Sequence, residues 1–313
     1  MEGGNYSRIS EFILLGLSDQ PEQERLLFLV FLLMYLITGL GNLLIILAIR
    51  IDSHLHTPMY FFLSNLSLVD ICFTSTTVPK MLANHVSGNK MIPYSGCLTQ
   101  VFFFLWFAAK DSFILTTMAY DRYVAICAPL HYSTVMTPRV CAFVLAVSWF
   151  STFINALTHT VLLTRLSFCG HNESPHFFCD LNPLLKLACS DTFINDLMVY
   201  TVGTLLIITP FIVILISYIH IIMAVLRIPS TSGKQKAFST CGSHLTVVSL
   251  FYGTLIGVYF SPTSTHTVQE DTVSAVMYTV VTPMMNPFIY SLRNKDMKGA
   301  LRMLLTRKPG LSL

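Results

Sequence analysis

Seven long apolar stretches constrain the fold of this chain more than any other feature. Each reaches the roughly 20 residues that a helix needs to cross about 30 Å of hydrocarbon. The stretches lie near residues 26–49, 59–81, 97–126, 140–163, 194–226, 238–260 and 272–292. Because a helix satisfies its own backbone polar groups in lipid, the sequence predicts an all-α membrane protein built as a seven-helix transmembrane bundle.

Composition supports a membrane chain rather than a soluble one. Only 11% of the 313 residues are charged, whereas 53% are hydrophobic; a soluble domain of this length normally carries roughly twice that charged fraction. No repeat or linker-like segment is visible, so we expect one integral domain over residues 26–292. No cleavable signal peptide is expected, because the apolar run 12–17 is short and lacks a basic region before it.

The basic residues predict the orientation of the bundle. Twelve of the 19 lysines and arginines fall after the first, third, fifth and seventh stretches: Arg50, Arg122, Arg139, Arg227, Lys234, Lys236, Arg293, Lys295, Lys298, Arg302, Arg307 and Lys308. The positive-inside rule therefore places residues 1–25 outside the cell and residues 293–313 in the cytoplasm. Within that tail, apolar residues recur at helical spacing among basic ones, which predicts an amphipathic helix on the inner leaflet.

A charged triplet, Asp121-Arg122-Tyr123, ends the third apolar stretch. A charge at the membrane boundary is costly unless it is paired or snorkels, so it is often functional. Asp121 is the obvious partner of Arg122, and a second partner could compete for the arginine, which would make the triplet a two-state latch. The alternative is an ordinary flanking cation with its counter-ion.

Four runs of sequence resemble the olfactory receptors, a branch of the rhodopsin-like seven-helix receptors that couple to G proteins. They are LHTPMYFF at 55–62, MAYDRYVAICAPLHY at 118–132, KAFSTCGSHL at 236–245 and PMMNPFIY at 283–290. The resemblance implies a rhodopsin-like bundle and a receptor rather than an enzyme. The residues it implicates in activation and G-protein coupling are Asp121, Arg122, Tyr123, Tyr218, His244, Asn286, Pro287 and Tyr290.

One departure from other rhodopsin-like receptors lies in the sixth stretch. The usual Cys-Trp-x-Pro switch is missing there, and Phe251-Tyr252-Gly253 stands in its place, as in olfactory members. A proline-hinge mechanism is therefore not expected.

The resemblance also implies a ligand and a partner. We expect a small, mostly apolar odorant to bind in the outer half of the bundle and a heterotrimeric stimulatory (olfactory) G protein to raise cyclic AMP at the plasma membrane. The pocket positions that match are Phe104, Leu105, Ala108, Val202, Leu206, Tyr252, Leu255 and Tyr259. An ordinary bundle core would show similar residues, and a rhodopsin-like receptor for a small metabolite outside the nose is the alternative function.

Other classes fit the sequence less well. A transporter would show paired repeats and broken helices, which are not visible. No Gly-x-Ser-x-Gly, His-Glu-x-x-His or phosphate loop suggests an enzyme, and no nucleic-acid partner is expected.

Asp70, Lys110 and Asp111 are ionisable residues deep within the apolar stretches. Asp70 and Asp111 are too deep to stay charged without a partner, a proton or an ion. The resemblance implies a sodium ion between them, with two separately protonated acids as the alternative; no other cofactor is expected. Lys110 points about 100° away from Asp111 on a helix. It could stay neutral, reach Asn155 or another polar group of the fourth stretch, pair with a polar odorant or, as we favour, snorkel.

Four cysteines are predicted on the oxidising face: Cys97, Cys169, Cys179 and Cys189. They allow three pairings, among which their spacing does not choose. The resemblance implies Cys97–Cys179 and Cys169–Cys189, which would hold the loop as a lid. On the same face, Asn5-Tyr6-Ser7 is the favoured glycosylation site and Asn172-Glu173-Ser174 a possible one.

Overall fold

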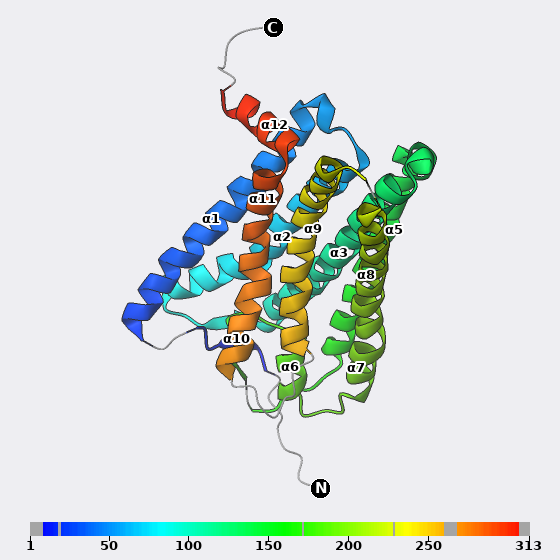
Figure 1. Ribbon diagram of the computed structural model, residues 1–313. Coiled ribbons are helices and arrows are strands. Elements are labelled where there is room, and N and C mark those ends of the chain that lie inside the picture. Colours follow the sequence, from blue (N-terminus) through cyan, green and yellow to red (C-terminus); the bar gives the residue numbers. More distant parts are fainter. Residues whose placement is uncertain (1–8, 18–19, 171, 228, 260–267, 307–313) are drawn as a thin grey trace.

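The computed structural model describes residues 9–17, 20–170, 172–227, 229–259 and 268–306. Within these residues, seven helical spans pack into one bundle (Figure 1). The first four are α1 (Pro21–Ile51), α2 (Pro58–Ser87), α3 (Tyr94–Cys127) and α5 (Pro138–Thr164). The fifth joins α7 (Phe193–Met198), the π-helical turn η3 (Val199–Gly203) and α8 (Thr204–Leu226). The sixth is α9 (Thr231–Tyr259), and the seventh joins α10 (Val268–Val276), the π-helical turn η4 (Met277–Val281) and α11 (Thr282–Arg293).

The predicted seven-helix bundle is confirmed. Among the described residues, the first five spans are each long and apolar enough to cross a membrane. The helix ends differ from the apolar limits: α1 begins at Pro21 and α9 at Thr231, each ahead of the predicted apolar residue. The apolar stretch marks the part of each helix in contact with lipid, whereas the backbone helix continues into polar sequence. In α1, a proline at the first helical position also favours the earlier start.

Helix α3 lies at the centre of the bundle, against α2, α5 and α8. Helix α1 is joined to the seventh span by two features. Asn42 Nδ2 donates a hydrogen bond to the Pro283 carbonyl oxygen at 3.3 Å. One residue earlier, a Cβ atom on Gly41 would lie only 3.0 Å from the ring of Pro287, so glycine is what permits this close approach.

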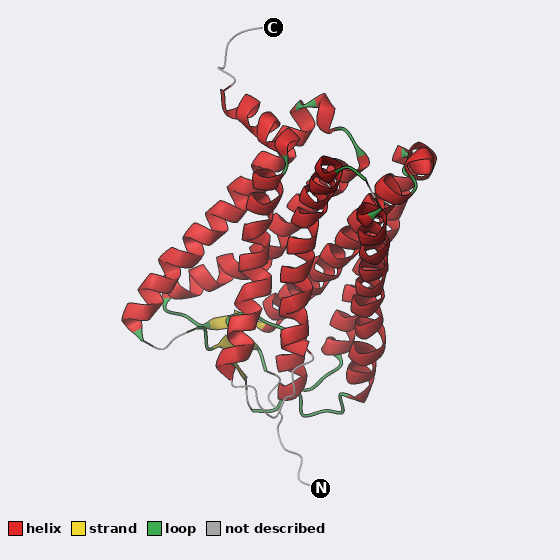
Figure 2. Ribbon diagram, in the orientation of Figure 1, coloured by secondary structure: helices red, strands yellow, loops and turns green. Residues whose placement is uncertain are grey.

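One end of the bundle carries a small sheet, which we call the sheet end (Figure 2). Strand β1 (Glu11–Leu14) pairs with β2 (Met91–Pro93) in antiparallel and with β3 (Glu173–Ser174) in parallel orientation. Phe12 and Leu14, both on β1, are 1% exposed. The sequence analysis did not predict these strands, because a four-residue run shows too little alternation to be distinguished from loop.

The opposite end carries α12 (Lys295–Thr306), and we call it the α12 end. Met297 and Ala300 are buried against the bundle, whereas Leu305 is 71% exposed. The amphipathic helix forms as expected, although Leu305 does not share its packed face. Asn5 lies outside the described residues, so its glycosylation stays a prediction.

Short helices occupy the connections. At the α12 end lie η1 (Ser53–Leu55), η2 (Pro129–His131) and α4 (Tyr132–Val135). At the sheet end, α6 (Leu181–Leu187) follows Cys179. The Asp180 carboxylate accepts a hydrogen bond from the Leu181 backbone N–H at 2.7 Å, and burial raises the pKa of Asp180 above its usual value.

Candidate functional site

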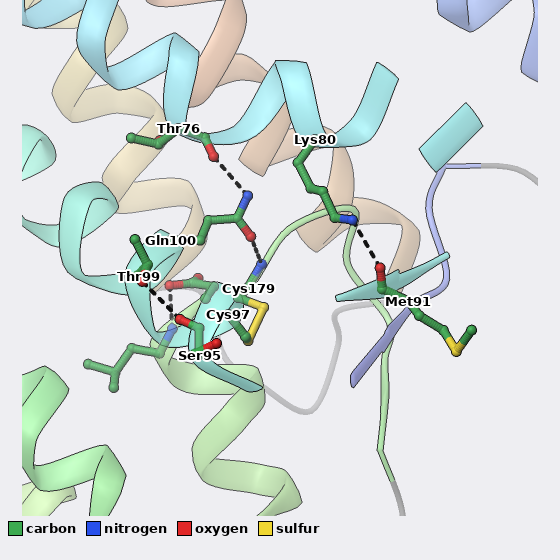
Figure 3. Close-up of a disulfide and its surroundings, with 10 residues drawn as sticks. Thr76, Lys80, Met91, Ser95, Cys97, Thr99, Gln100 and Cys179 are labelled. Carbon is green, nitrogen blue, oxygen red and sulfur yellow. Dashed lines mark hydrogen bonds between the residues drawn. A yellow bond between two sulfur atoms is a disulfide. The ribbon is translucent and has the colours of Figure 1, made fainter. Parts of the chain in front are cut away.

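Two disulfides close the sheet end of the bundle. Cys97, in the first turn of α3, is bonded to Cys179 with a Cα–Cα distance of 5.5 Å, and Cys169 is bonded to Cys189 at 5.8 Å (Figure 3 shows the first). These are the pairs that the family resemblance implies. Because Phe177 and Phe178 directly precede Cys179, the first bond holds both rings over the bundle.

The predicted pocket residues lie beneath this loop and contribute unequally. Phe104 on α3 is 2% exposed, and its ring centroid lies 5.0 Å from that of Phe178 and 5.9 Å from that of Tyr278. Tyr252 on α9 is also buried. Its hydroxyl lies 2.6 Å from Ser112 Oγ, and its ring centroid 4.8 Å from that of Phe211. Phe104, Phe178 and Tyr278 thus form an aromatic cluster that joins α3, the loop and the seventh span. Tyr252 and Phe211 form a second aromatic contact, between α9 and α8.

The remaining predicted pocket residues differ in burial and in the element to which they belong. Leu105, Ala108 and Leu206 are half-buried, and Leu255 is buried. Val202 belongs to the π-helical turn η3. The side chain of Tyr259 lies outside what the structure describes. Sequence analysis missed Phe178, Tyr278, Ser112 and Phe211 as neighbours; the position of Phe178 beside Cys179 was the one signal that could have found it.

A separate cavity of about 130 Å³ lies at the sheet end, between the turns of α1 and α2 nearest the sheet. Phe28, His85 and Phe177 are among the residues that line it. None of the predicted pocket residues lines this cavity.

Asp70 and Asp111 have different surroundings. Both carboxylate oxygens of Asp70 accept hydrogen bonds from Asn286 Nδ2, at 3.1 and 2.9 Å. Asp70 is thus the polar partner that links α2 to the Asn-Pro-x-x-Tyr segment of α11. Asp111 is 4% exposed, and its Oδ1 atom is buried without a hydrogen-bond partner.

Lys110 does not snorkel, so the favoured interpretation is wrong. Its side chain is fully buried between α3 and α5. The ammonium donates hydrogen bonds to Ser148 Oγ and, at 3.2 Å, to the Leu145 carbonyl oxygen. It also lies 4.9 Å from the centre of the Trp149 ring. Lys110 reaches a polar group of the fourth span, as one of the alternatives proposed, but that group is Ser148 rather than Asn155.

We expect Lys110→Met to be tolerated and Lys110→Glu to be damaging. Methionine fills a similar volume, and Ser148 keeps its own bond to Leu145 O at 2.8 Å, so no polar atom loses its only partner. Glutamate would place an unpaired carboxylate in the same buried space. Thermal unfolding of the detergent-solubilised receptor measures this: the Met variant should match the parent within about 1 kcal/mol. Equal damage from both variants would show that the buried ammonium itself is required.

The Asp121-Arg122 pair predicted from the sequence is not formed. Asp121 Oδ1 instead accepts a hydrogen bond from the Tyr132 hydroxyl at 2.8 Å. Burial, followed by the charge of Asp121, raises the pKa of Tyr132, so this phenol stays protonated. Arg122 Nε is buried without a partner, and no ion pair joins it to Asp121 in the part of the chain that is described. Neighbouring helical side chains diverge by about 100°, which leaves Asp121 to the tyrosine.

A histidine links three helices near Arg122. His244 on α9 shares a hydrogen bond through Nδ1 with the Tyr218 hydroxyl of α8, with 2.7 Å between the atoms. Its Nε2 atom lies 3.0 Å from the Leu115 carbonyl oxygen of α3. A carbonyl oxygen can only accept, so Nε2 carries a proton in this arrangement. The predicted activation residues Tyr218 and His244 are therefore in direct contact.

The other predicted activation residues are Tyr123, Asn286, Pro287 and Tyr290. Tyr123 is half-buried, with its ring centroid 5.7 Å from that of His220. Asn286 bonds Asp70, and Pro287 lies against Gly41. The Tyr290 hydroxyl is buried without a hydrogen-bond partner. Tyr290 and Arg122 thus both keep buried polar atoms unsatisfied, as expected of groups that exchange partners between two states.

The fold and these polar links define a rhodopsin-like seven-helix membrane receptor. The sequence model of the olfactory receptor family matches residues 31–308. The chain is 61% identical to olfactory receptor 1f45 of Rattus norvegicus over 308 residues, which is 98% of each chain. It is 59% identical to olfactory receptor 1F1 of Homo sapiens and 58% identical to olfactory receptor 1M1 of Mus musculus, again over 98% of each chain. The chain therefore belongs to the olfactory receptor family, whose members are receptors and not enzymes.

Proposed function

We propose that this odorant receptor binds small, mostly apolar volatile molecules beneath the disulfide-held loop and activates a stimulatory G protein to raise cyclic AMP. The observation that carries the proposal is the buried aromatic cluster of Phe104, Phe178 and Tyr278 beneath the loop. Small-molecule sites are mostly apolar and carry a few placed polar groups. The hydroxyls of Tyr252 and Ser112 are such groups here.

The chemistry of this cluster favours weak, selective binding. An odorant that buries about 200 Å² of apolar surface gains about 5 kcal/mol at about 25 cal/mol per Å². The loss of translational and rotational freedom offsets part of that gain. We therefore expect dissociation constants of about 0.2 mM or weaker from this apolar burial alone, with the Tyr252 hydroxyl orienting ligands that carry one polar group.

Substitutions on α3 test the ligand site. Ala108→Leu narrows the predicted pocket and should lower the potency of bulky odorants about tenfold, a loss of about 1.4 kcal/mol. Leu105→Ala should lower the potency of small odorants, because it removes apolar side-chain surface against which they would pack. Phe103→Leu is the matched control, since Phe103 is on the same helix but 38% exposed. Cyclic AMP dose–response curves at matched surface levels measure all three. Unchanged potency in both pocket variants would contradict the assigned site.

We infer that the sheet end faces outward and the α12 end faces the cytoplasm of the plasma membrane. Two disulfides lie at the sheet end, as an oxidising exterior favours. Lys295, Lys298 and Arg302 lie on α12, as the positive-inside rule favours for the cytoplasmic side. Antibody access to epitope tags at either terminus of intact cells tests this orientation: only an amino-terminal tag should stain.

We also infer that a sodium ion binds between Asp70 and Asp111. The buried, unpartnered Oδ1 atom of Asp111 fits such a role, because an orphaned carboxylate oxygen in the bundle needs a cation or a proton. Bound sodium would neutralise one carboxylate, with a proton on the other acid balancing its charge, and would favour the unactivated packing. Replacing extracellular sodium with choline should raise odorant potency in the parent receptor and leave Asp111→Asn unaffected. Identical responses of the parent in both media would contradict the sodium site.

A further inference from the structure

Gln100 is a buried polar residue of α3 with no role in the function described so far. It lies one turn beyond Cys97 and one turn before Phe104, and it is 6% exposed. Its amide uses both ends: Nε2 donates to the Thr76 carbonyl oxygen of α2 at 2.8 Å, and Oε1 accepts from the Cys179 N–H at 2.8 Å. Figure 3 shows the side chain between the two partners.

The partner on α2 lies close to a proline inside that helix. Pro79, inside α2, lacks the N–H that would bond the carbonyl four residues earlier, and its ring disturbs the preceding turn. Thr76 belongs to that turn. The carbonyl that Pro79 leaves without a helical donor is that of Ser75, and Gln100 donates to the next carbonyl of the same turn, that of Thr76.

The partner in the loop is the backbone of a disulfide cysteine. The Cys97–Cys179 disulfide fixes the position of the Cys179 side chain. It leaves the Cys179 backbone free to rotate relative to that side chain. The hydrogen bond from Cys179 N–H to Gln100 removes this freedom, and Cys179 is itself fully buried. Phe178 is therefore held in one orientation, against Phe104.

We propose that Gln100 is a positioning residue for odorant recognition. Its amide fixes the loop segment 177–179 over the ligand site and couples that segment to the turn of α2 that precedes Pro79. The proposal rests on the proposed function for the ligand site. Its geometric part, the fixed loop, holds independently of any ligand.

Two variants of Gln100 and one control distinguish the effects of its two hydrogen bonds. Gln100→Leu loses both. Gln100→Glu keeps an acceptor for Cys179 N–H but sets a carboxylate against the Thr76 carbonyl oxygen. Thr99→Val is the matched control, since the neighbouring Thr99 is exposed and its Oγ1 bonds only Ser95 O of its own helix, at 2.8 Å.

The first readout is hydrogen–deuterium exchange of the loop peptide that contains residues 177–179, in purified receptor with the disulfide intact. Exchange should be roughly tenfold faster in Gln100→Leu, close to the parent in Gln100→Glu and unchanged in Thr99→Val. Unchanged exchange in Gln100→Leu would overturn the proposal, whether or not an odorant is known.

The second readout is cyclic AMP across a homologous series of odorants of increasing chain length. Gln100→Leu should lower potency roughly tenfold and change the rank order of chain lengths, with the maximal response retained. If the loop peptide of Gln100→Leu exchanges faster but odorant potency and rank order stay as in the parent, Gln100 has only a structural role. That result would overturn the proposal. If the parent receptor answers no odorant, the proposed function fails, while the exchange result still decides whether Gln100 fixes the loop.

Discussion

Replacing Cys179 with serine is expected to remove this receptor from the cell surface almost entirely. The Cys97–Cys179 bond closes a loop with a sequence separation of 82 residues. In the chain-entropy model, a loop of that length contributes about 4 kcal/mol to the free energy of unfolding. Loss of the bond also leaves Phe177 and Phe178 without their covalent anchor above Phe104, so the remaining folded receptor should respond poorly.

Flow cytometry of an epitope-tagged receptor measures this effect. Cys127→Ser is the matched control, because Cys127 is a free, half-buried cysteine on the same helix as Cys97. The control should reach the surface at the level of the parent, whereas Cys179→Ser and Cys97→Ser should not. Parental surface staining and an unaltered odorant response in Cys179→Ser would contradict the role given to this disulfide.

Replacing Arg122 with alanine is expected to abolish signalling without abolishing folding. Arg122 lies toward the α12 end of α3, and Asp121 is occupied by Tyr132 rather than by the arginine. On activation we expect α9 to separate from α3, which requires the His244–Leu115 bond to break, and the guanidinium can then take a new partner. The alanine side chain has neither the charge nor the hydrogen-bond donors of the guanidinium, so it cannot make the new contact.

The measurement is the maximal cyclic AMP response at matched surface expression, which should fall by about two orders of magnitude or to background, the scale of a lost charged hydrogen-bonded contact. Arg139→Ala is the control, because Arg139 is exposed at the same end of the bundle, in the first turn of α5. A normal response from Arg122→Ala would mean that coupling runs through other residues.

The sequence predicted the bundle well because apolar length is a one-dimensional property. A run such as 194–226 has to cross lipid as a helix whatever it packs against. It could not predict the small sheet, since β1 gains its stability from partners about 80 and 160 residues away. The π-helical turns η3 and η4 also leave no mark in a pattern of apolar residues.

The candidate site was predicted by residue type but not by partner. Asp121 and Arg122 are adjacent in sequence, yet Tyr132 takes the carboxylate. Lys110 was expected to reach toward the membrane surface, but Ser148 and Trp149 of α5 give its ammonium a buried partner and an aromatic face. Which side chain meets a buried charge is decided by helix packing, and a single sequence does not contain that packing. The same reason kept Gln100 out of the predicted site.

The most direct test of the central claim is cyclic AMP in cells that display this receptor, challenged with a broad odorant panel, with and without the stimulatory Gα subunit. The account predicts a dose-dependent rise with at least one small apolar odorant, and loss of that rise when the subunit is absent. A response that persists without the stimulatory subunit, or none from well-displayed receptor across the panel, would contradict it.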